Sequence, residues 1–241
     1  MSLIDLIRKG GSAPKCSAVI VAAGSSVRMG YDKLTAQLGA SPVLLRTLRA
    51  FDASEHVSEI VIVTRMDRVA EIADLCAQNG IAKVSKVVAG GRTRMESSLI
   101  GVSAVKSNAR LIAIHDAARP LVSSALIKRV VCAADEHKAA VPVVPSTDTL
   151  KAVGEDDFIF GTVDRESTYR VQTPQVFDAI LIKGALTRAA ESGLSLSDDS
   201  AAMEMTGFRT YAVAGEEDNI KITTPRDLLI AEAILRDKGE L

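Results

Sequence analysis

The stretch AVIVAAGSSVRMGYDK, residues 18–33, decides the fold. Its first half is an apolar run rich in β-branched residues, which predicts a buried strand over residues 17–23. The chain then changes abruptly to small residues, followed by Arg28 and Lys33. Small residues let backbone N–H groups approach an anion closely, and two cations within reach of the same site suit a polyphosphate. The alternative is a tight turn with two solvated cations, but the combination of strand, loop and cations favours phosphate binding.

This loop differs from two well-known nucleotide-binding patterns. It has neither the GxxxxGK[ST] pattern of a P-loop nor the GxGxxG pattern of dinucleotide-binding folds. A nicotinamide-dependent oxidoreductase would need GxGxxG after the first strand, so the sequence argues against that class of enzyme.

Strand and helix patterns alternate along most of the chain. We expect further strands over 59–65, 84–91, 110–116 and 208–215, and helices over 42–54, 67–78, 93–106, 123–137 and 224–238. Such alternation predicts an α/β fold, in which a Rossmann-like, mainly parallel sheet is flanked by helices. Ligands of such sheets bind where loops leave the carboxyl ends of the strands.

Three charged loops fall at these strand ends: GSSVR, GGRTR and HDAARP. In the second loop a glycine pair precedes Arg94, Ser97 and Ser98, which either surround a ligand or form only a bend and a helix cap. In the third loop Asp116 ends an apolar strand, where its carboxylate can hold a hydrated Mg²⁺ or a substrate hydroxyl. The alternative is an Asp116–Arg119 pair that fixes the loop. We expect His115 to be a packed or capping histidine and not a general base.

One segment departs from the alternation. Residues 146–173 look like short β segments around the polar turn GEDD, which predicts a protruding hairpin arm. A two-stranded arm is marginal alone, so we expect it to pack on a second subunit. We therefore expect an N-terminal extension over 1–16 and a single domain over 17–241, with 146–173 as a dimerisation arm. Residues 197–199 are expected to cap a short helix that begins with SAAMEM.

Composition excludes several classes of protein. The net charge of the 241 residues is −1 and only 3% of them are aromatic, which argues against nucleic acid as a partner. No apolar stretch reaches the length of a membrane span, so no membrane partner is expected. Cys16, Cys76 and Cys132 are scattered, which is typical of reduced thiols in a cytoplasmic protein.

The first loop resembles the signature loop of sugar- and polyol-phosphate nucleotidylyltransferases. Together with HDAARP, TVDR, TPQ and DNIK, it makes the chain similar to the 2-C-methyl-D-erythritol 4-phosphate cytidylyltransferase family of isoprenoid biosynthesis, from about Ser17 to about Leu235. Asp32 stands before Lys33, where this family usually has proline. The resemblance implies transfer of a cytidylyl group from CTP to 2-C-methyl-D-erythritol 4-phosphate, with release of pyrophosphate. A ribitol- or other polyol-phosphate cytidylyltransferase is the nearest alternative, and a silent nucleotide-binding module is the alternative from another class.

The resemblance also implies residue roles. Residues implied to hold CTP are Ala22, Ala23, Gly24, Ser25, Gly91 and Ser97. Arg28 and Lys33 are implied to stabilise the charge that develops on the triphosphate, with Mg²⁺ as the cofactor and its ligands unknown. Residues implied to line the polyol-phosphate pocket are Asp116, Arg119 and Thr173. Arg165 and Lys221 are implied to position the attacking phosphate, and Thr149 and Arg165 lie on an arm that crosses to the partner subunit of a homodimer.

Overall fold

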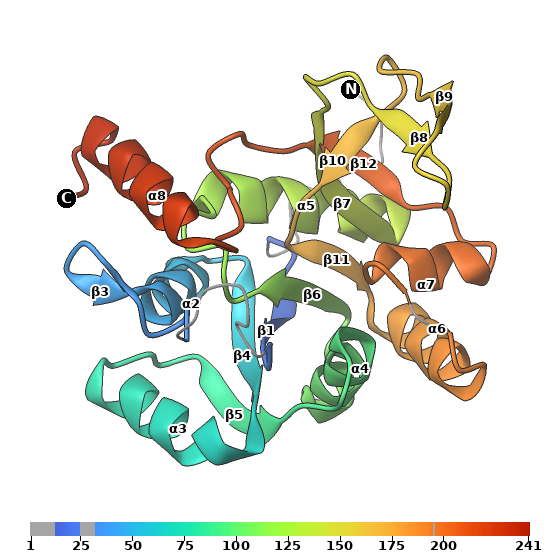
Figure 1. Ribbon diagram of the computed structural model, residues 1–241. Coiled ribbons are helices and arrows are strands. Elements are labelled where there is room, and N and C mark those ends of the chain that lie inside the picture. Colours follow the sequence, from blue (N-terminus) through green and yellow to red (C-terminus); the bar gives the residue numbers. More distant parts are fainter. Residues whose placement is uncertain (1–12, 25–31, 195) are drawn as a thin grey trace, which may run out of the picture.

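A computed structural model describes residues 13–24, 32–194 and 196–241. Eight strands form one sheet, in which seven follow the order β10-β7-β11-β6-β1-β4-β5 and β12 pairs with β7 (Figure 1). The strands of this sheet are β1 (Cys16–Ala22), β4 (Val57–Thr64), β5 (Val84–Ala89), β6 (Leu111–Asp116), β7 (Ala139–Pro145), β10 (Tyr169–Val171), β11 (Gln175–Asp178) and β12 (Tyr211–Ala214).

Helices connect most of these strands and flank the sheet (Figure 1). They are α2 (Val43–Ala53), α3 (Val69–Gln78), α4 (Arg94–Ala104), α5 (Ser124–His137), α6 (Ala179–Glu191), α7 (Ser200–Met205) and α8 (Pro225–Asp237), with a short 3₁₀ turn, η2 (Met66–Arg68), before α3. Two small strands, β2 (Gln37–Leu38) and β3 (Ser41–Pro42), form a separate pair before α2. The expected α/β fold is therefore confirmed.

The centre of the sheet is parallel and its far half is mixed. β1 pairs in parallel with both β4 and β6, as the buried apolar run of β1 predicts. β11 lies antiparallel between β6 and β7. Residues 175–191, for which the sequence pattern predicts no element, form β11 and α6. β11 has only four residues, too few for a clear alternation of apolar and polar side chains.

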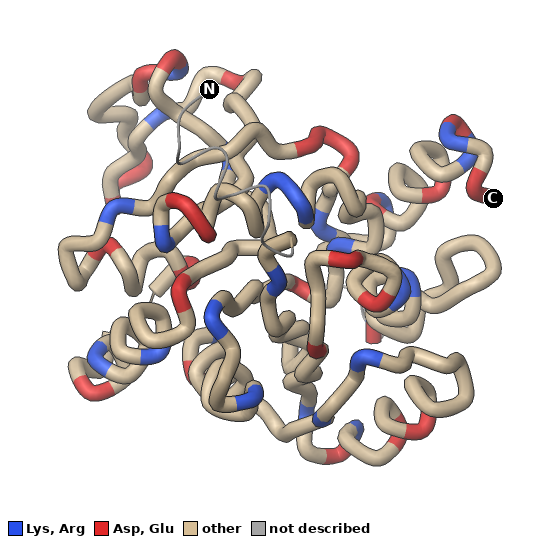
Figure 2. Tube along the Cα trace, turned by 180° about the vertical axis from the view of Figure 1, so that it is seen from behind, with Lys and Arg blue, Asp and Glu red and all other residues tan. Residues whose placement is uncertain are grey.

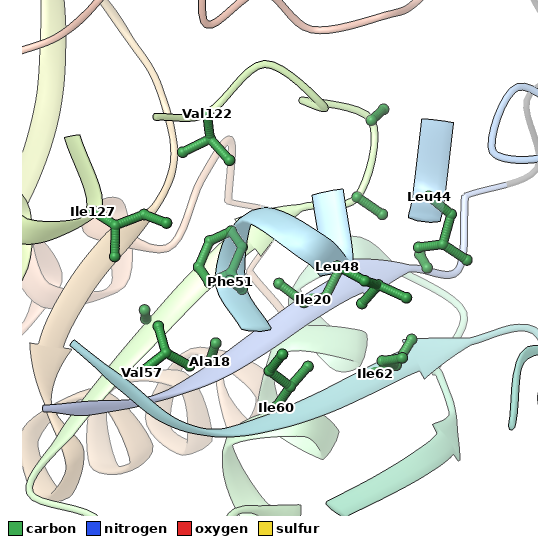
Figure 3. Packing of buried hydrophobic residues seen from close by; sticks show 14 of the residues in the cluster. Ala18, Ile20, Leu44, Leu48, Phe51, Val57, Ile60, Ile62, Val122 and Ile127 are labelled. Atoms are coloured by element: carbon green, nitrogen blue, oxygen red, sulfur yellow. The ribbon is translucent and has the colours of Figure 1, made fainter. Parts of the chain in front are cut away.

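Alternate residues of β1 build two apolar cores, one on each face of the sheet. Ala18 and Ile20 belong to the core beneath α2 and α5, while Val19 belongs to the core beneath α4 and α6. Figure 3 shows Phe51 and Leu48 of α2 lying over Ile20 of β1 and Ile60 of β4. Phe51 and Ile20 are fully buried. This packing on both faces holds the strand ends, and the loops that leave them, in fixed positions.

The segment 146–173 contains a hairpin outside the main sheet. β8 (Lys151–Val153) and β9 (Ile159–Thr162) pair with each other in a two-stranded sheet, and the chain then returns to the main sheet as β10 (Figure 1). Large apolar side chains on the hairpin face solvent, among them Phe158 at 75% exposure and Phe160 at 74%.

Charged residues of both signs are distributed along the chain (Figure 2). Figure 2 shows Lys and Arg interspersed with Asp and Glu along the trace. No helix in the described ranges combines the length and the apolar character that a bilayer crossing requires.

Candidate active site

A pocket of about 340 Å³ lies at the carboxyl ends of β1, β5 and β6. It is lined by eight of the residues to which the resemblance assigns roles: Ala22, Ala23, Gly24, Lys33, Gly91, Ser97, Asp116 and Lys221. These residues come from the segments that follow three parallel strands of the sheet, with β4 lying between β1 and β5, and from the loop before α8. The described residues of these loops therefore meet at one edge of the sheet.

Close packing between the first two loops explains the glycine pair after β5. A Cβ atom on Gly90 would lie 2.7 Å from Cβ of Ala23 and 2.7 Å from Oγ of Ser97, and a Cβ on Gly91 would collide with Glu96. Ser97 Oγ accepts a hydrogen bond from the Gly91 N–H at 3.2 Å and donates one to the Thr93 carbonyl at 2.9 Å. These contacts fix the backbone of the second loop against the first.

Lys33 is held close to Lys221. Its Nζ donates a hydrogen bond to the carbonyl of Ile222 at 3.1 Å. Asp32 supports this turn, because its carboxylate accepts from the Leu34 N–H at 3.0 Å and forms an ion pair with Arg68. Two lysines far apart in the sequence thus reach one pocket.

Three cations among the described residues surround Asp116. Its Oδ2 lies 2.8 Å from Lys221 Nζ and 3.8 Å from Arg119 Nε, and its Oδ1 lies 3.3 Å from Arg94 Nη2. Burial alone would raise the pKa of this carboxyl, but the positive charges of Arg94, Lys221 and Arg119 outweigh burial and hold the pKa well below its usual range. Asp116 is therefore held as a charged carboxylate near neutral pH.

Thr173 and His115 support the backbone of Asp116 from behind. The Asp116 N–H donates to Thr173 Oγ1 at 3.1 Å, and Thr173 Oγ1 lies 3.0 Å from His115 Nδ1. His115 Nε2 lies 3.2 Å from the carbonyl of Arg119, so this nitrogen carries the proton. Burial lowers the pKa of His115 to about 3. His115 is thus a neutral, packed histidine, as expected.

Arg119 also lies behind the pocket and not in its lining. Its Nη1 donates to the carbonyl of Asn219 at 2.7 Å, and Asn219 Nδ2 donates to the carbonyl of Thr173 at 2.9 Å. The Ile222 N–H donates to the carbonyl of Ala118 at 2.8 Å. These bonds join the HDAARP and DNIK loops, which is how Lys221 comes to lie beside Asp116.

The remaining predicted residues fall into two groups. Thr149 and Arg165 are exposed in the 146–173 segment, and neither is among the described residues that line the pocket. Ser25 and Arg28 lie outside the described residues.

Two residues have contacts that the sequence did not predict. Arg94, for which the sequence left open a ligand contact or a helix cap, lines the pocket and joins Asp116 to Asp199. Residues 197–199 were expected to cap α7, which is confirmed in part: Asp199 occupies the N-cap position, but its side chain makes no capping hydrogen bond. The neighbouring Asp198 fills that role, since its Oδ1 accepts from the Ala201 N–H at 3.1 Å. No short-range pattern in the sequence connects Arg94 with Asp199.

The described residues do not fit a metal site built by the protein alone. Among them no group of three or more His, Cys, Asp or Glu side chains is arranged to hold an ion. Asp116 is the one carboxylate among the described residues that line the pocket, and cations already surround it. A divalent cation in this pocket would need most of its ligands from a bound substrate.

Comparison with known proteins gives a consistent result. The family model of 2-C-methyl-D-erythritol 4-phosphate cytidylyltransferase matches residues 16–237. A relative of that name from Caldanaerobacter subterraneus is 42% identical over 91% of this chain and 98% of its own length. A second one, from Halalkalibacterium halodurans, is 41% identical over 92% of this chain and 97% of its own length.

Solved structures agree. The 4-diphosphocytidyl-2C-methyl-D-erythritol synthase from Anaerococcus prevotii matches with a TM-score of 0.83 and 32% identity, over 93% of this chain and 97% of that one. The 2-C-methyl-D-erythritol 4-phosphate cytidylyltransferase from Thermus thermophilus matches with a TM-score of 0.76 and 33% identity, over 92% of this chain and 99% of that one.

Proposed function

Since this chain belongs to the 2-C-methyl-D-erythritol 4-phosphate cytidylyltransferase family, we propose that its pocket performs the transfer for which the family is named. CTP and 2-C-methyl-D-erythritol 4-phosphate are the substrates, and the CDP-linked methylerythritol and pyrophosphate are the products. The reaction belongs to isoprenoid precursor biosynthesis. The observation that carries this function is the convergence of Lys33, Lys221 and Asp116 in one pocket at the carboxyl ends of the parallel strands.

The chemistry requires positioning more than proton transfer. A phosphate oxygen of the methylerythritol phosphate attacks the α-phosphorus of CTP in line with the departing pyrophosphate. A phosphate monoester is mostly ionised near neutral pH, because its second pKa is about 6. The attacking oxygen therefore needs no general base, which agrees with a neutral His115 held away from the pocket by its own hydrogen bonds.

The main obstacle is the repulsion between two polyanions, which cations in the pocket reduce. We assign Lys33 and Arg28 to the triphosphate, where negative charge grows as pyrophosphate leaves. Lys221 and Arg165 are assigned to the phosphate of the methylerythritol substrate. Ala22, Ala23, Gly24 and Ser25 offer backbone to CTP, with Gly91 and Ser97 on the opposing loop.

Asp116, Arg119, Thr149 and Thr173 complete the assignment for the polyol phosphate. Asp116 lines the pocket and is held as a carboxylate, so it is suited to accept hydrogen bonds from substrate hydroxyls. Thr173 and Arg119 act from behind by fixing the loop that carries Asp116. Thr149 lies on the 146–173 arm, so it would reach a pocket only through that arm.

Mg²⁺ enters this proposal as part of the nucleotide substrate. The triphosphate would supply the oxygen ligands that the described residues lack, and a bound Mg²⁺ would neutralise part of the triphosphate charge.

A homodimer in the cytoplasm is the remaining part of the proposal. The exposed Phe158, Ile159 and Phe160 on the β8–β9 hairpin form an apolar surface that a second subunit would cover. Arg165 follows this hairpin and faces solvent in its own chain, which supports an arm that delivers Arg165 to a neighbour's pocket. The free thiols of Cys16, Cys76 and Cys132 support a reducing compartment.

The test is pyrophosphate release with each of the four nucleoside triphosphates against 2-C-methyl-D-erythritol 4-phosphate and ribitol 5-phosphate. CTP with the methylerythritol phosphate should be strongly preferred, because glycine-rich loops that offer backbone groups at close range suit a pyrimidine edge better than a purine. Equal turnover with ATP would contradict the nucleotide assignment. Faster turnover of ribitol 5-phosphate would contradict the choice of polyol phosphate.

A further inference from the structure

Arg94 joins the pocket to a buried carboxylate behind it. It is the first residue of α4, and its side chain lines the pocket with 28% of its surface exposed. Nε and Nη2 both lie 3.3 Å from Asp116 Oδ1, and Nη1 lies 2.8 Å from Asp199 Oδ2. One guanidinium thus spans two carboxylates that come from the end of β6 and the start of α7.

The two oxygens of Asp116 have different partners. Arg94 contacts Oδ1, whereas Lys221 and Arg119 approach Oδ2. Lys221 is assigned to the phosphate of the substrate, so its contact with Asp116 must weaken when that phosphate binds. The contact at Oδ1 does not depend on Lys221, because Arg94 comes from a different element.

Asp199 restrains Arg94. The Asp199 carboxylate is only 1% exposed, and burial raises its pKa while the charge of Arg94 acts against that rise. A buried carboxylate needs a positive partner in a fixed place, and a planar guanidinium with several N–H groups can serve two carboxylates at once. The Asp199 contact therefore limits the orientations that Arg94 can adopt toward Asp116.

We propose that Arg94, anchored on Asp199, is a positioning residue for cytidylyl transfer, which orients the Asp116 carboxylate toward the polyol phosphate while Lys221 moves to the substrate phosphate. This inference rests on the proposed function of the pocket. It assigns Arg94 an effect that passes through Asp116 and not through direct contact with either substrate.

A double-mutant cycle on kcat/KM for 2-C-methyl-D-erythritol 4-phosphate tests this path. Arg94→Met alone should lower kcat/KM by about 10- to 100-fold, the usual effect of losing a partner that orients a site residue. In an Asp116→Asn background, Arg94→Met should cost less than about threefold, because the carboxylate that it orients is already gone. The matched control is Arg92→Met, which removes a neighbouring cation whose side chain is 92% exposed and pairs with Glu96. Arg92→Met should lower kcat/KM by the same factor in the wild type and in the Asp116→Asn background, whatever that factor is.

A second comparison separates positioning from folding. Arg94→Met leaves Asp199 buried without a cation and should lower Tm, and adding Asp199→Asn should restore much of that Tm. Restored Tm with activity still low supports a positioning role. Activity that recovers together with Tm would show a purely structural role and overturn the proposal.

The remaining outcomes are also decisive. If the wild type is active but the losses in kcat/KM from Arg94→Met and Asp116→Asn multiply in the double variant, the proposed role of Arg94 is wrong. The cytidylyl transfer itself would stand. Wild-type protein that releases no pyrophosphate from CTP and 2-C-methyl-D-erythritol 4-phosphate would overturn the proposed function, and the role of Arg94 with it.

Discussion

Lys221 Nζ lies 2.8 Å from Asp116 Oδ2, so the cation assigned to the substrate phosphate is paired with the carboxylate assigned to the substrate hydroxyls. Each partner keeps the other in the pocket before substrate arrives. A methylerythritol phosphate brings both an anion for Lys221 and hydroxyl donors for Asp116. A ligand that is only an anion satisfies Lys221 but leaves Asp116 without a new partner. The pair therefore favours a substrate that carries both groups.

Asp116→Asn should separate these two effects. It removes the charged acceptor for the hydroxyls, so kcat/KM for the methylerythritol phosphate should fall about 10- to 100-fold, since a hydrogen bond to a charged group contributes roughly 1.5–3 kcal/mol. It also releases Lys221, so inorganic phosphate should become a stronger competitive inhibitor. Steady-state kinetics with phosphate as inhibitor measures both changes.

The matched control is Asp218→Asn, in the neighbouring loop. Asp218 pairs with Lys238 at 2.8 Å and is not among the described residues that line the pocket. This variant should keep the inhibition constant for phosphate unchanged. Weaker inhibition by phosphate in Asp116→Asn would show that Asp116 does not compete for Lys221.

Lys33→Ala should lower kcat more than it raises KM for CTP. Lys33 is assigned to the charge that develops on the leaving pyrophosphate, and losing one such preorganised donor typically costs about 10²–10³ in kcat. The residue lies in a loop and its Nζ contacts a backbone carbonyl, so the fold should persist. Lys128→Ala, which changes an exposed lysine on α5, is the control. An unchanged kcat, or an unfolded variant by circular dichroism, would contradict this role.

The sequence predicts those parts of the fold that depend on local patterns. Periodic apolar residues predict α2, and Leu44, Leu48 and Phe51 do face the core. The short β11 pairs antiparallel with β6 and β7, a partnership that no local pattern encodes. Only the strand order of the folded sheet shows this pairing of β11.

In the candidate site, too, local sequence patterns predict some features, while others depend on tertiary contacts. Small residues and cations after strands predict the pocket, because parallel strands bring their carboxyl ends together. The ion pairs of Arg94 depend on three-dimensional contacts with residues much later in the chain. Asp199 looked like a helix cap because the sequence shows only that it precedes a helix. In the folded protein the neighbouring Asp198 caps α7, and Asp199 is directed toward Arg94.

His115 should make stability depend on pH. Its pKa is lowered to about 3 in the folded protein by burial, from an ordinary value of 6.5. Below pH 6.5 the unfolded chain gains a proton there that the folded protein does not, so the free energy of unfolding falls as the pH decreases toward 3. The slope from one such proton is at most about 1.4 kcal/mol per pH unit.

Urea unfolding between about pH 7 and about pH 5 measures this slope. His115→Gln should be less stable than the wild type at neutral pH, yet its stability should decline less steeply with acid, because the titrating group is gone. His137→Gln, which changes an exposed histidine and keeps His115, should retain the steeper decline. Parallel curves for the wild type and His115→Gln would show that His115 takes up its proton in the folded state as well.

The β8–β9 hairpin should place Arg165 in the active site of a second subunit. Phe158 and Phe160 are 75% and 74% exposed on this hairpin, and a two-stranded sheet with an apolar surface needs a partner to cover it. In a two-fold dimer, exchange of the hairpins would cover both surfaces and bring Arg165 of each chain to the pocket of the other. Lys33, by contrast, lines the pocket of its own chain.

Mixing two inactive variants tests this arrangement. Arg165→Ala and Lys33→Ala homodimers should each be nearly inactive. After subunit exchange, a mixed dimer with crossed arms has one pocket with both substitutions and one with neither, so each mixed dimer should regain about half the activity of the wild type. If each hairpin serves its own chain, every pocket of a mixed dimer carries one substitution, and activity stays low. Mixed dimers verified by mass spectrometry that regain no activity would therefore rule out the crossed arm, while the role of Lys33 in cytidylyl transfer would stand.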